Sequence, residues 1–112
     1  MTLGFGQTLI IEGRTRVIDG DTIKIAKNRI RLHGIDAPEN KQLCKDKKLS
    51  HWLCGQAATK ALRKKINNRV VECFSDKKDR YKRHIAICSV DGANLNRWLV
   101  LNGWAVAYRK YS

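Results

Sequence analysis

Four carboxylates gather in one short part of a chain that is otherwise poor in acidic residues. The 112 residues include 23 Lys and Arg against 10 Asp and Glu, and Asp19, Asp21, Asp36 and Glu39 all lie between positions 19 and 39. Oxygen ligands of this kind suit calcium or magnesium, whereas crowded carboxylates without a cation repel one another or take up protons. Asp-Gly and Asp-x-Pro are also common turn sequences, so either stretch alone is more typical of a turn than of a site.

Two arginines accompany these acids. Arg31 lies between the two pairs of acids, and Arg83 opens a later apolar segment after the charged stretch 76–82. A guanidinium matches phosphate oxygens and can stabilise charge that develops on phosphorus. A cation, a carboxylate that positions or deprotonates water and two arginines make up a metal-assisted phosphodiesterase. The three histidines have no metal-ligand spacing, and the chain has no Gly-x-Ser-x-Gly or phosphate-binding glycine loop.

Hydrophobic periodicity predicts the elements that bring these residues together. Residues 22–26 and 29–35 alternate apolar and polar side chains, which predicts two strands joined by a tight turn at 27–28. The open end of such a hairpin brings residue 21 close to residue 36. This pairing of two acidic stretches favours a metal site over two unrelated turns.

The remaining elements complete a small, mainly β fold with helices. A strand over 8–18 precedes the hairpin, and helical spacing begins after Ser50, a plausible N-cap, and continues to Ile66. Two strands, a short helix and an extended tail follow at 69–75, 83–90, 94–103 and 104–108. We expect an OB-type five-stranded antiparallel barrel with two or three helices, forming a single domain over 1–112 with 1–7 loose. An open five-stranded sheet with both helices on one side is the alternative.

The charge balance indicates a partner. The formal net charge is +13, and a field of that sign and size favours nucleic acid or a similar polyanion. No run of eighteen apolar residues occurs, which argues against a transmembrane helix and a membrane partner. The first residues do not resemble an intact signal peptide, so Met1 is either a native start or replaces a removed signal.

The four cysteines leave two interpretations open. No C-x-x-C spacing occurs among Cys44, Cys54, Cys73 and Cys88, which makes a zinc ribbon or a thioredoxin-type motif a poor interpretation. An even number permits two disulfides in an oxidising compartment. Four reduced cysteines, two of them packed in apolar strands, fit the sequence equally well.

In this order and at these separations, the motifs resemble the thermonuclease (staphylococcal nuclease-like) family. The matching segments are "IDGDT" (18–22), "RLHGIDAPE" (31–39), "DRYKR" (79–83) and "DGANLNRWLVLNGWAVAY" (91–108). The resemblance implies an OB-type barrel and a calcium-dependent nuclease that hydrolyses DNA and RNA phosphodiesters and leaves 3′-phosphates. A non-catalytic nucleic-acid-binding OB module is the rival interpretation, although such a module has no need of the full set of acids and arginines.

The resemblance also implies a role for each matching residue. The calcium ligands would be Asp21, Asp36 and the backbone carbonyl of Ala37, with Asp19 supporting the ion through water. Glu39 would position or deprotonate the attacking water, and Arg31 and Arg83 would bind the phosphate. The residues expected to contact the nucleotide are Tyr81, Tyr108 and Lys82, with Tyr111 a further candidate whose spacing is off by one. Lys82 stands where the family usually has glycine.

The resemblance further bears on the cysteines and on the location of the protein. Many bacterial relatives are exported, and Cys73 and Cys88 fall on neighbouring strands, so we expect the disulfides Cys44–Cys54 and Cys73–Cys88. A secreted or periplasmic location is expected, with a cytoplasmic one as the alternative, and a monomer is the default.

Overall fold

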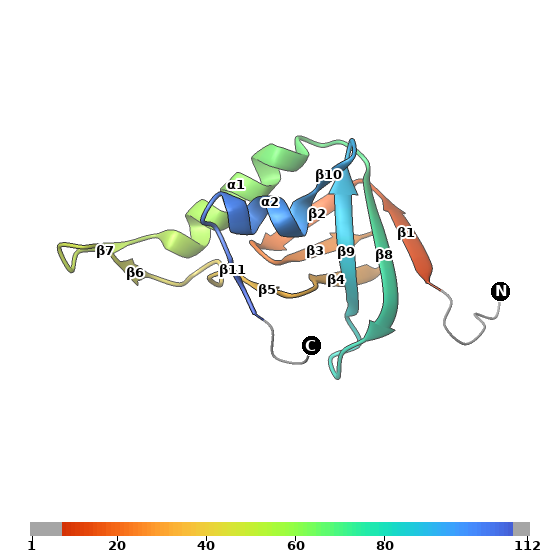
Figure 1. Ribbon diagram of the computed structural model, residues 1–112, viewed down its shortest axis with the longest axis horizontal. Coiled ribbons are helices and arrows are strands. Elements are labelled where there is room, and N and C mark those ends of the chain that lie inside the picture. The colour runs from red at the N-terminus through yellow and green to blue at the C-terminus, as the bar shows by residue number, and fades with distance from the viewer. Residues whose placement is uncertain (1–7, 109–112) are drawn as a thin grey trace.

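The computed structural model describes residues 8–108, which form mostly strands and, within that range, two helices. The main sheet curls into a half-barrel (Figure 1). Its strands follow the order β1-β8-β9-β4-β3-β2, with β10 beside β9. They span Leu9–Gly13 (β1), Thr15–Asp19 (β2), Thr22–Ile25 (β3), Asn28–Leu32 (β4), Val71–Lys78 (β8), His84–Val90 (β9) and Ala93–Asn94 (β10). The prediction of a mainly β fold with helices, of OB type, is confirmed.

The β3–β4 hairpin forms as its alternating pattern predicts. Ile23 and Ile30 are cross-strand partners, and both are fully buried in the core. Because side chains on a strand alternate between the two faces, the hairpin's apolar residues enter the core while Arg31 faces the other way. The hairpin therefore presents a polar face beside its acidic open end.

Two features of the sheet differ from the predictions. The segment 8–18 is not one strand, because β1 pairs with β8 while β2 pairs with β3. The break falls at Arg14, directly after Gly13, where a Cβ would lie 2.9 Å from Cγ2 of Ile25. The barrel is also not wholly antiparallel, because β4 and β9 pair in parallel, with Ile30 opposite His84.

Two helices pack against the sheet. Helix α1 (Cys54–Ile66) contacts β2, and α2 (Leu95–Leu101) contacts β9. Asn94 is the N-cap of α2, where its side chain accepts a hydrogen bond from the Arg97 N–H. Buried apolar side chains from both helices and from β3, β4, β8 and β9 share one core: Ile23, Ile30, Leu32, Leu62, Ile66, Val71, Val90, Leu95 and Leu99.

The prediction that Ser50 caps the first helix is wrong. Residues before α1 instead form a small hairpin of β6 (Cys44–Lys45) and β7 (His51–Trp52) that projects away from the sheet (Figure 1). No side chain caps α1 at Leu53. The Gly55 N–H is instead satisfied by the Gln42 carbonyl at 3.2 Å.

The segments expected to be a loop and a tail are both more ordered than expected. Strand β8 continues to Lys78, so the charged loop shrinks to a turn at 79–83. In the tail, β11 (Val106–Ala107) pairs with β5 (Ile35–Asp36), directly after the β3–β4 hairpin. Tyr111 and the segment 1–7 lie outside the described residues.

Disulfides join Cys44 to Cys54 and Cys73 to Cys88, the same pairs that the resemblance implies. The first closes the base of the β6–β7 hairpin, and the second links the neighbouring strands β8 and β9 with a Cα–Cα distance of 4.1 Å. Within residues 8–108, neither helix is long and apolar enough to cross a membrane.

Candidate active site

Asp21 occupies the open end of the β3–β4 hairpin and is only 7% exposed. Its backbone carbonyl accepts a hydrogen bond from the Leu32 N–H at 2.8 Å, which closes the hairpin. Its carboxylate accepts from the Thr22 hydroxyl at 3.0 Å and from the Ala37 N–H at 2.9 Å. The hairpin thus brings Asp21 against the segment 36–37, as its predicted geometry requires.

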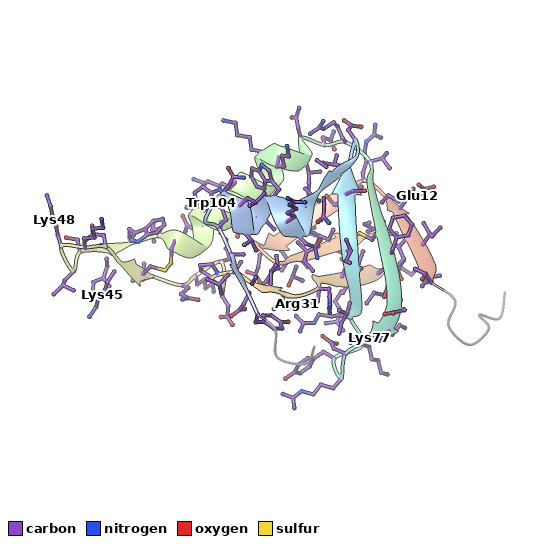
Figure 2. The ribbon with its side chains drawn as sticks, viewed as in Figure 1. Glu12, Arg31, Lys45, Lys48, Lys77 and Trp104 are labelled. Carbon is purple, nitrogen blue, oxygen red and sulfur yellow. A yellow bond between two sulfur atoms is a disulfide. The ribbon has the colours of Figure 1, made fainter. Side chains whose placement is uncertain are left out.

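Arg31 lies between two of the carboxylates. Its Nη1 is 3.4 Å from Oδ2 of Asp21, and its Nη2 is 3.5 Å from Oδ1 of Asp36. A direct charge-assisted hydrogen bond has a length of about 2.7–2.9 Å, so the guanidinium is shared between the two acids without binding tightly to either. Figure 2 shows Arg31 at the margin of the main sheet, on the side away from α1. This arrangement leaves the guanidinium able to donate to a further anionic group.

Glu39 lies on a tight turn that the N-terminus of α1 supports. The Glu39 carbonyl accepts from the Gln42 N–H at 2.8 Å, and its N–H donates to Oε1 of Gln42 at 3.2 Å. A Cβ at Gly55 would lie 1.6 Å from the Glu39 carbonyl oxygen, so α1 approaches this turn more closely than any other residue type permits. On the other side, Oδ1 of Asp19 accepts from the Asn40 N–H at 2.8 Å.

Within residues 8–108, the Glu39 carboxylate has no hydrogen-bond or ion-pair partner, and its side chain is exposed. The role of Gly55 was missed at the sequence level, although a glycine inside a helical pattern signals a close approach. Backbone contacts on both sides therefore fix the turn, while the carboxylate remains available to a ligand.

Arg83 is held by the turn between β8 and β9. Its Nε lies 2.8 Å from Oδ2 of Asp79, and Oδ1 of the same carboxylate accepts from the N–H groups of Tyr81 and Arg83, each at 2.9 Å. Burial raises the pKa of Asp79, but the hydrogen bonds from Arg83 and Tyr81 outweigh it and hold this pKa below its ordinary value. Lys82 takes the left-handed conformation at φ +65°, which explains why glycine suits this position.

The parallel pairing of β4 with β9 sets the relation between the two arginines. Ile30 is opposite His84, and both are buried on the inner face. Burial, followed by the positive charge of Lys78, lowers the pKa of His84. Arg83 immediately precedes β9, so this pairing places the turn that carries Arg83 beside β4, the strand that carries Arg31.

The two expected nucleotide-contacting tyrosines are both exposed, but they come from different elements. The Tyr81 ring lies under the guanidinium groups of Arg80 and Arg83, at 4.9 and 5.4 Å from the ring centre. Tyr108 follows β11, and its N–H donates to the Gly34 carbonyl at 3.0 Å. The β5–β11 pairing thus places Tyr108 beside the acidic end of the hairpin.

The donors at this end of the hairpin fit a hard cation such as calcium. The carboxylates of Asp21 and Asp36 both lie near the Arg31 guanidinium. Ala37, the residue after Asp36, is hydrogen-bonded to Asp21 through its backbone N–H. Calcium accepts carboxylate, carbonyl and water oxygens together. Among residues 8–108, no three His, Cys, Asp or Glu side chains group into a metal centre by themselves. A cation here would therefore rely on backbone and water oxygens as well.

Comparisons with known proteins agree with these motifs. The model of the family described as "Staphylococcal nuclease homologue" matches residues 29–112. The chain is 40% identical to a succinoglycan biosynthesis protein, ExoI, of Rhizobium meliloti, over 95% of this chain and 56% of that protein. It is 34% identical to an uncharacterized endonuclease of Escherichia coli O157:H7, over 91% of this chain and 64% of that protein. An uncharacterized endonuclease of Haemophilus influenzae is 31% identical, over 87% of this chain and 52% of that protein.

The chain spans between about half and two thirds of the length of these curated relatives. The family model nevertheless covers the segments that carry Arg31, Asp36, Glu39 and Arg83. This chain belongs to the staphylococcal nuclease family.

Proposed function

We propose that this protein is a calcium-dependent nuclease that hydrolyses phosphodiester bonds of DNA and RNA and leaves 3′-phosphates. The observation that carries the proposal is the shared position of Arg31 between Asp21 and Asp36, with Arg83 directly before β9, the strand that pairs with β4. Membership of the nuclease family and the endonuclease names of two relatives support the same conclusion.

The acidic end of the hairpin would hold the calcium ion. Asp21 and Asp36 would each supply a carboxylate oxygen, Ala37 its backbone carbonyl, and Asp19 would support the ion through a water molecule. When bound, the ion supplies positive charge that attracts a phosphate oxygen and the attacking water. Ala37 can serve as well as any residue, because only its backbone contributes.

Glu39 would orient the water and take its proton. The water oxygen forms a bond to phosphorus in line with the 5′-oxygen, whose bond to phosphorus breaks, and that oxygen takes up a proton. Arg31 and Arg83 would donate to the non-bridging oxygens as negative charge grows on them. Tyr81, Tyr108 and Lys82 would contact the nucleotide on either side.

We further propose that the protein acts as a monomer in a secreted or periplasmic location. Disulfides persist in oxidising compartments and are rare where thiols are kept reduced. The two disulfides, Cys44–Cys54 and Cys73–Cys88, therefore support an extracytoplasmic environment.

DNA digestion tests the proposed reaction in three samples: the wild type with calcium, the wild type with a chelator, and the Glu39→Gln variant with calcium. Loss of a general base costs about 10²–10⁴ in rate, so we expect Glu39→Gln to lower kcat by that factor and the chelator to stop cleavage. Glu12→Gln is the matched control, because Glu12 lies exposed on β1, far from Arg31 (Figure 2).

Cleavage that persists in the chelator would exclude the calcium reaction. Nucleic-acid binding without cleavage under any divalent ion would favour the rival function, a non-catalytic binding module. Wild-type cleavage by Glu39→Gln would remove Glu39 from its proposed role.

A further inference from the structure

A stiff, projecting hairpin follows the Glu39 turn, and the proposed chemistry does not use it. We call residues 41–53, which include β6 and β7, the arm; it extends away from the sheet (Figure 1). The Cys44–Cys54 disulfide closes its base, and the β6–β7 ladder pairs Lys45 with His51. The Asp46 carboxylate accepts from the N–H groups of Lys48 and Ser50 at 2.8 and 3.0 Å, which fixes the tip.

The arm is strongly cationic. It contains four lysines and a single acid, Asp46, whose carboxylate is already engaged by the backbone of the tip. All four lysine side chains are exposed, and Figure 2 shows Lys45 and Lys48 pointing outward. A surface of this charge suits a polyanion, and the disulfide and hydrogen bonds of the backbone keep the four lysines on one projection. The lysines are Lys41, Lys45, Lys47 and Lys48.

A groove of about 310 Å³ links the base of the arm to the candidate active site. Asp36 and Ala37 line one part of the groove, and Trp52 with the Cys44–Cys54 disulfide lines another. Trp104, just before β11, contributes a second indole. The groove therefore begins at two of the proposed calcium ligands and continues to the arm.

The chemistry of this groove differs from that of the arm. Among the described residues, its lining has no lysine or arginine, and beyond Asp36 and Gln42 it is mostly apolar, with two tryptophans, a proline and a disulfide. Trp52 is 44% exposed although it is one of the largest apolar side chains. Exposed tryptophan beside a cationic strip is the combination that binds unpaired bases by stacking while lysines bind the phosphates.

We infer that the groove and the arm form a second nucleic-acid subsite, in which an unpaired base next to the cleaved bond stacks on Trp52 and Trp104 while the flanking phosphates contact the arm lysines. This inference rests on the proposed function, because it takes nucleic acid as the substrate. A base within a duplex has both faces covered by its neighbours, so the subsite favours single strands.

A single strand long enough to reach the groove and the arm should bind more tightly than a dinucleotide, and this difference in affinity measures the contribution of the subsite. In a Glu39→Gln background with calcium, fluorescence anisotropy gives Kd for a dinucleotide and for a single strand of about ten nucleotides. Base–aromatic stacking energies of about 1–3 kcal/mol correspond to roughly 5- to 150-fold in Kd. We expect Trp52→Ala to reduce the ratio of the two Kd values by about tenfold and Trp52→Phe to retain most of it.

Leu49→Ala is the control on the same arm, because Leu49 is 73% exposed at the tip and does not line the groove. An unchanged Kd ratio in Trp52→Ala, or an equal loss in Leu49→Ala, would overturn the inference. A lower ratio in Trp52→Ala that Trp52→Phe does not restore would also overturn it, because the aromatic face would not be responsible. Absence of DNA cleavage by the wild type with calcium would instead defeat the proposed function, since the binding measurements need no cleavage.

Discussion

At the scale of single residues, Gly55 is the point at which α1 meets the turn that carries Glu39. It is buried, its N–H bonds to the Gln42 carbonyl, and any Cβ would overlap the Glu39 carbonyl oxygen. An exposed glycine inside a helix usually gains about 1 kcal/mol of stability on replacement by alanine. At Gly55 we expect alanine to destabilise the protein instead, because its Cβ would meet backbone atoms of Glu39 and Asn40 rather than a flexible side chain.

Gly55→Ala is expected to lower both the thermal midpoint and kcat. The added methyl group displaces the Glu39 turn, and a shift of about 1 Å in a catalytic group can cost about a hundredfold in rate. Thermal unfolding and DNA hydrolysis with calcium measure the two effects. Gln56→Ala changes the next, exposed position of α1 and should leave both near wild type. A Gly55→Ala enzyme with wild-type kcat would show that this packing does not position Glu39.

At the scale of elements, the two disulfides stabilise different parts of the fold. Cys73 and Cys88 belong to the buried core cluster and link strands β8 and β9, which carry the Arg83 turn at one end. Cys44 and Cys54 join the base of the arm to the start of α1, outside that cluster. Loss of the first bridge must loosen the sheet, whereas loss of the second can be confined to the arm.

Cys73→Ala/Cys88→Ala is expected to lower the free energy of unfolding by at least about 3 kcal/mol, the value for closing a loop of about 15 residues. Cys44→Ala/Cys54→Ala should cost less stability and should mainly reduce the affinity gained by longer strands, because the arm loses its rigid base. Urea unfolding and the Kd ratio measure the two effects. A larger stability loss from the arm pair than from the core pair would contradict this division.

The same elements show which parts of the structure the sequence could predict. The β3–β4 hairpin and its acidic open end follow from a period of two over 22–35, because local alternation encodes both strands and their register. The arm was missed because β6 and β7 have two residues each, too few for any period to be visible. Ser50 misled the prediction of the helix start because a backbone carbonyl, not a side chain, meets the first turn of α1.

The relation between Arg31 and Arg83 was also beyond local reasoning. Each arginine was identified by residue type and motif, but the parallel β4–β9 pairing is what places the Arg83 turn beside the strand that carries Arg31. No local pattern encodes a pairing between segments so far apart in the chain. The docking of the 104–108 tail on β5 escaped prediction for the same reason.

At the scale of the whole molecule, a net charge of +13 is spread over several surfaces. The arm and the outer face of α1, with Lys60 and Lys64, contribute exposed cations, and the two site arginines contribute partly buried ones. Only those that touch phosphates release counterions on binding. The salt dependence of the affinity therefore distinguishes the cations that contact the strand from those that merely attract it.

Lys47→Ala/Lys48→Ala is expected to flatten the salt dependence of single-strand binding. The slope of log K against log salt is negative, and each lost phosphate contact makes it about 0.7 less steep for a single strand. The double variant should therefore have a slope that is about 1.4 less steep than that of the wild type. Titrations between roughly 50 and 200 mM salt measure this slope. Lys60→Ala/Lys64→Ala removes the same charge from α1 and should leave the slope unchanged. Equal slopes for the two variants would place the strand elsewhere.

The parallel pairing of β4 with β9 has a consequence for the order in which the site is completed. A chain that has formed only the β3–β4 hairpin already brings Asp21 to the end of β4, the strand that carries Arg31. It lacks both Arg83 and the pairing of Asp36 with β11. Pairing across such a sequence separation is slow compared with hairpin formation, so we expect the second arginine to reach the site after the hairpin has formed. A partly folded or nascent chain therefore lacks part of the candidate site, and we expect the proposed hydrolysis only once the sheet has closed.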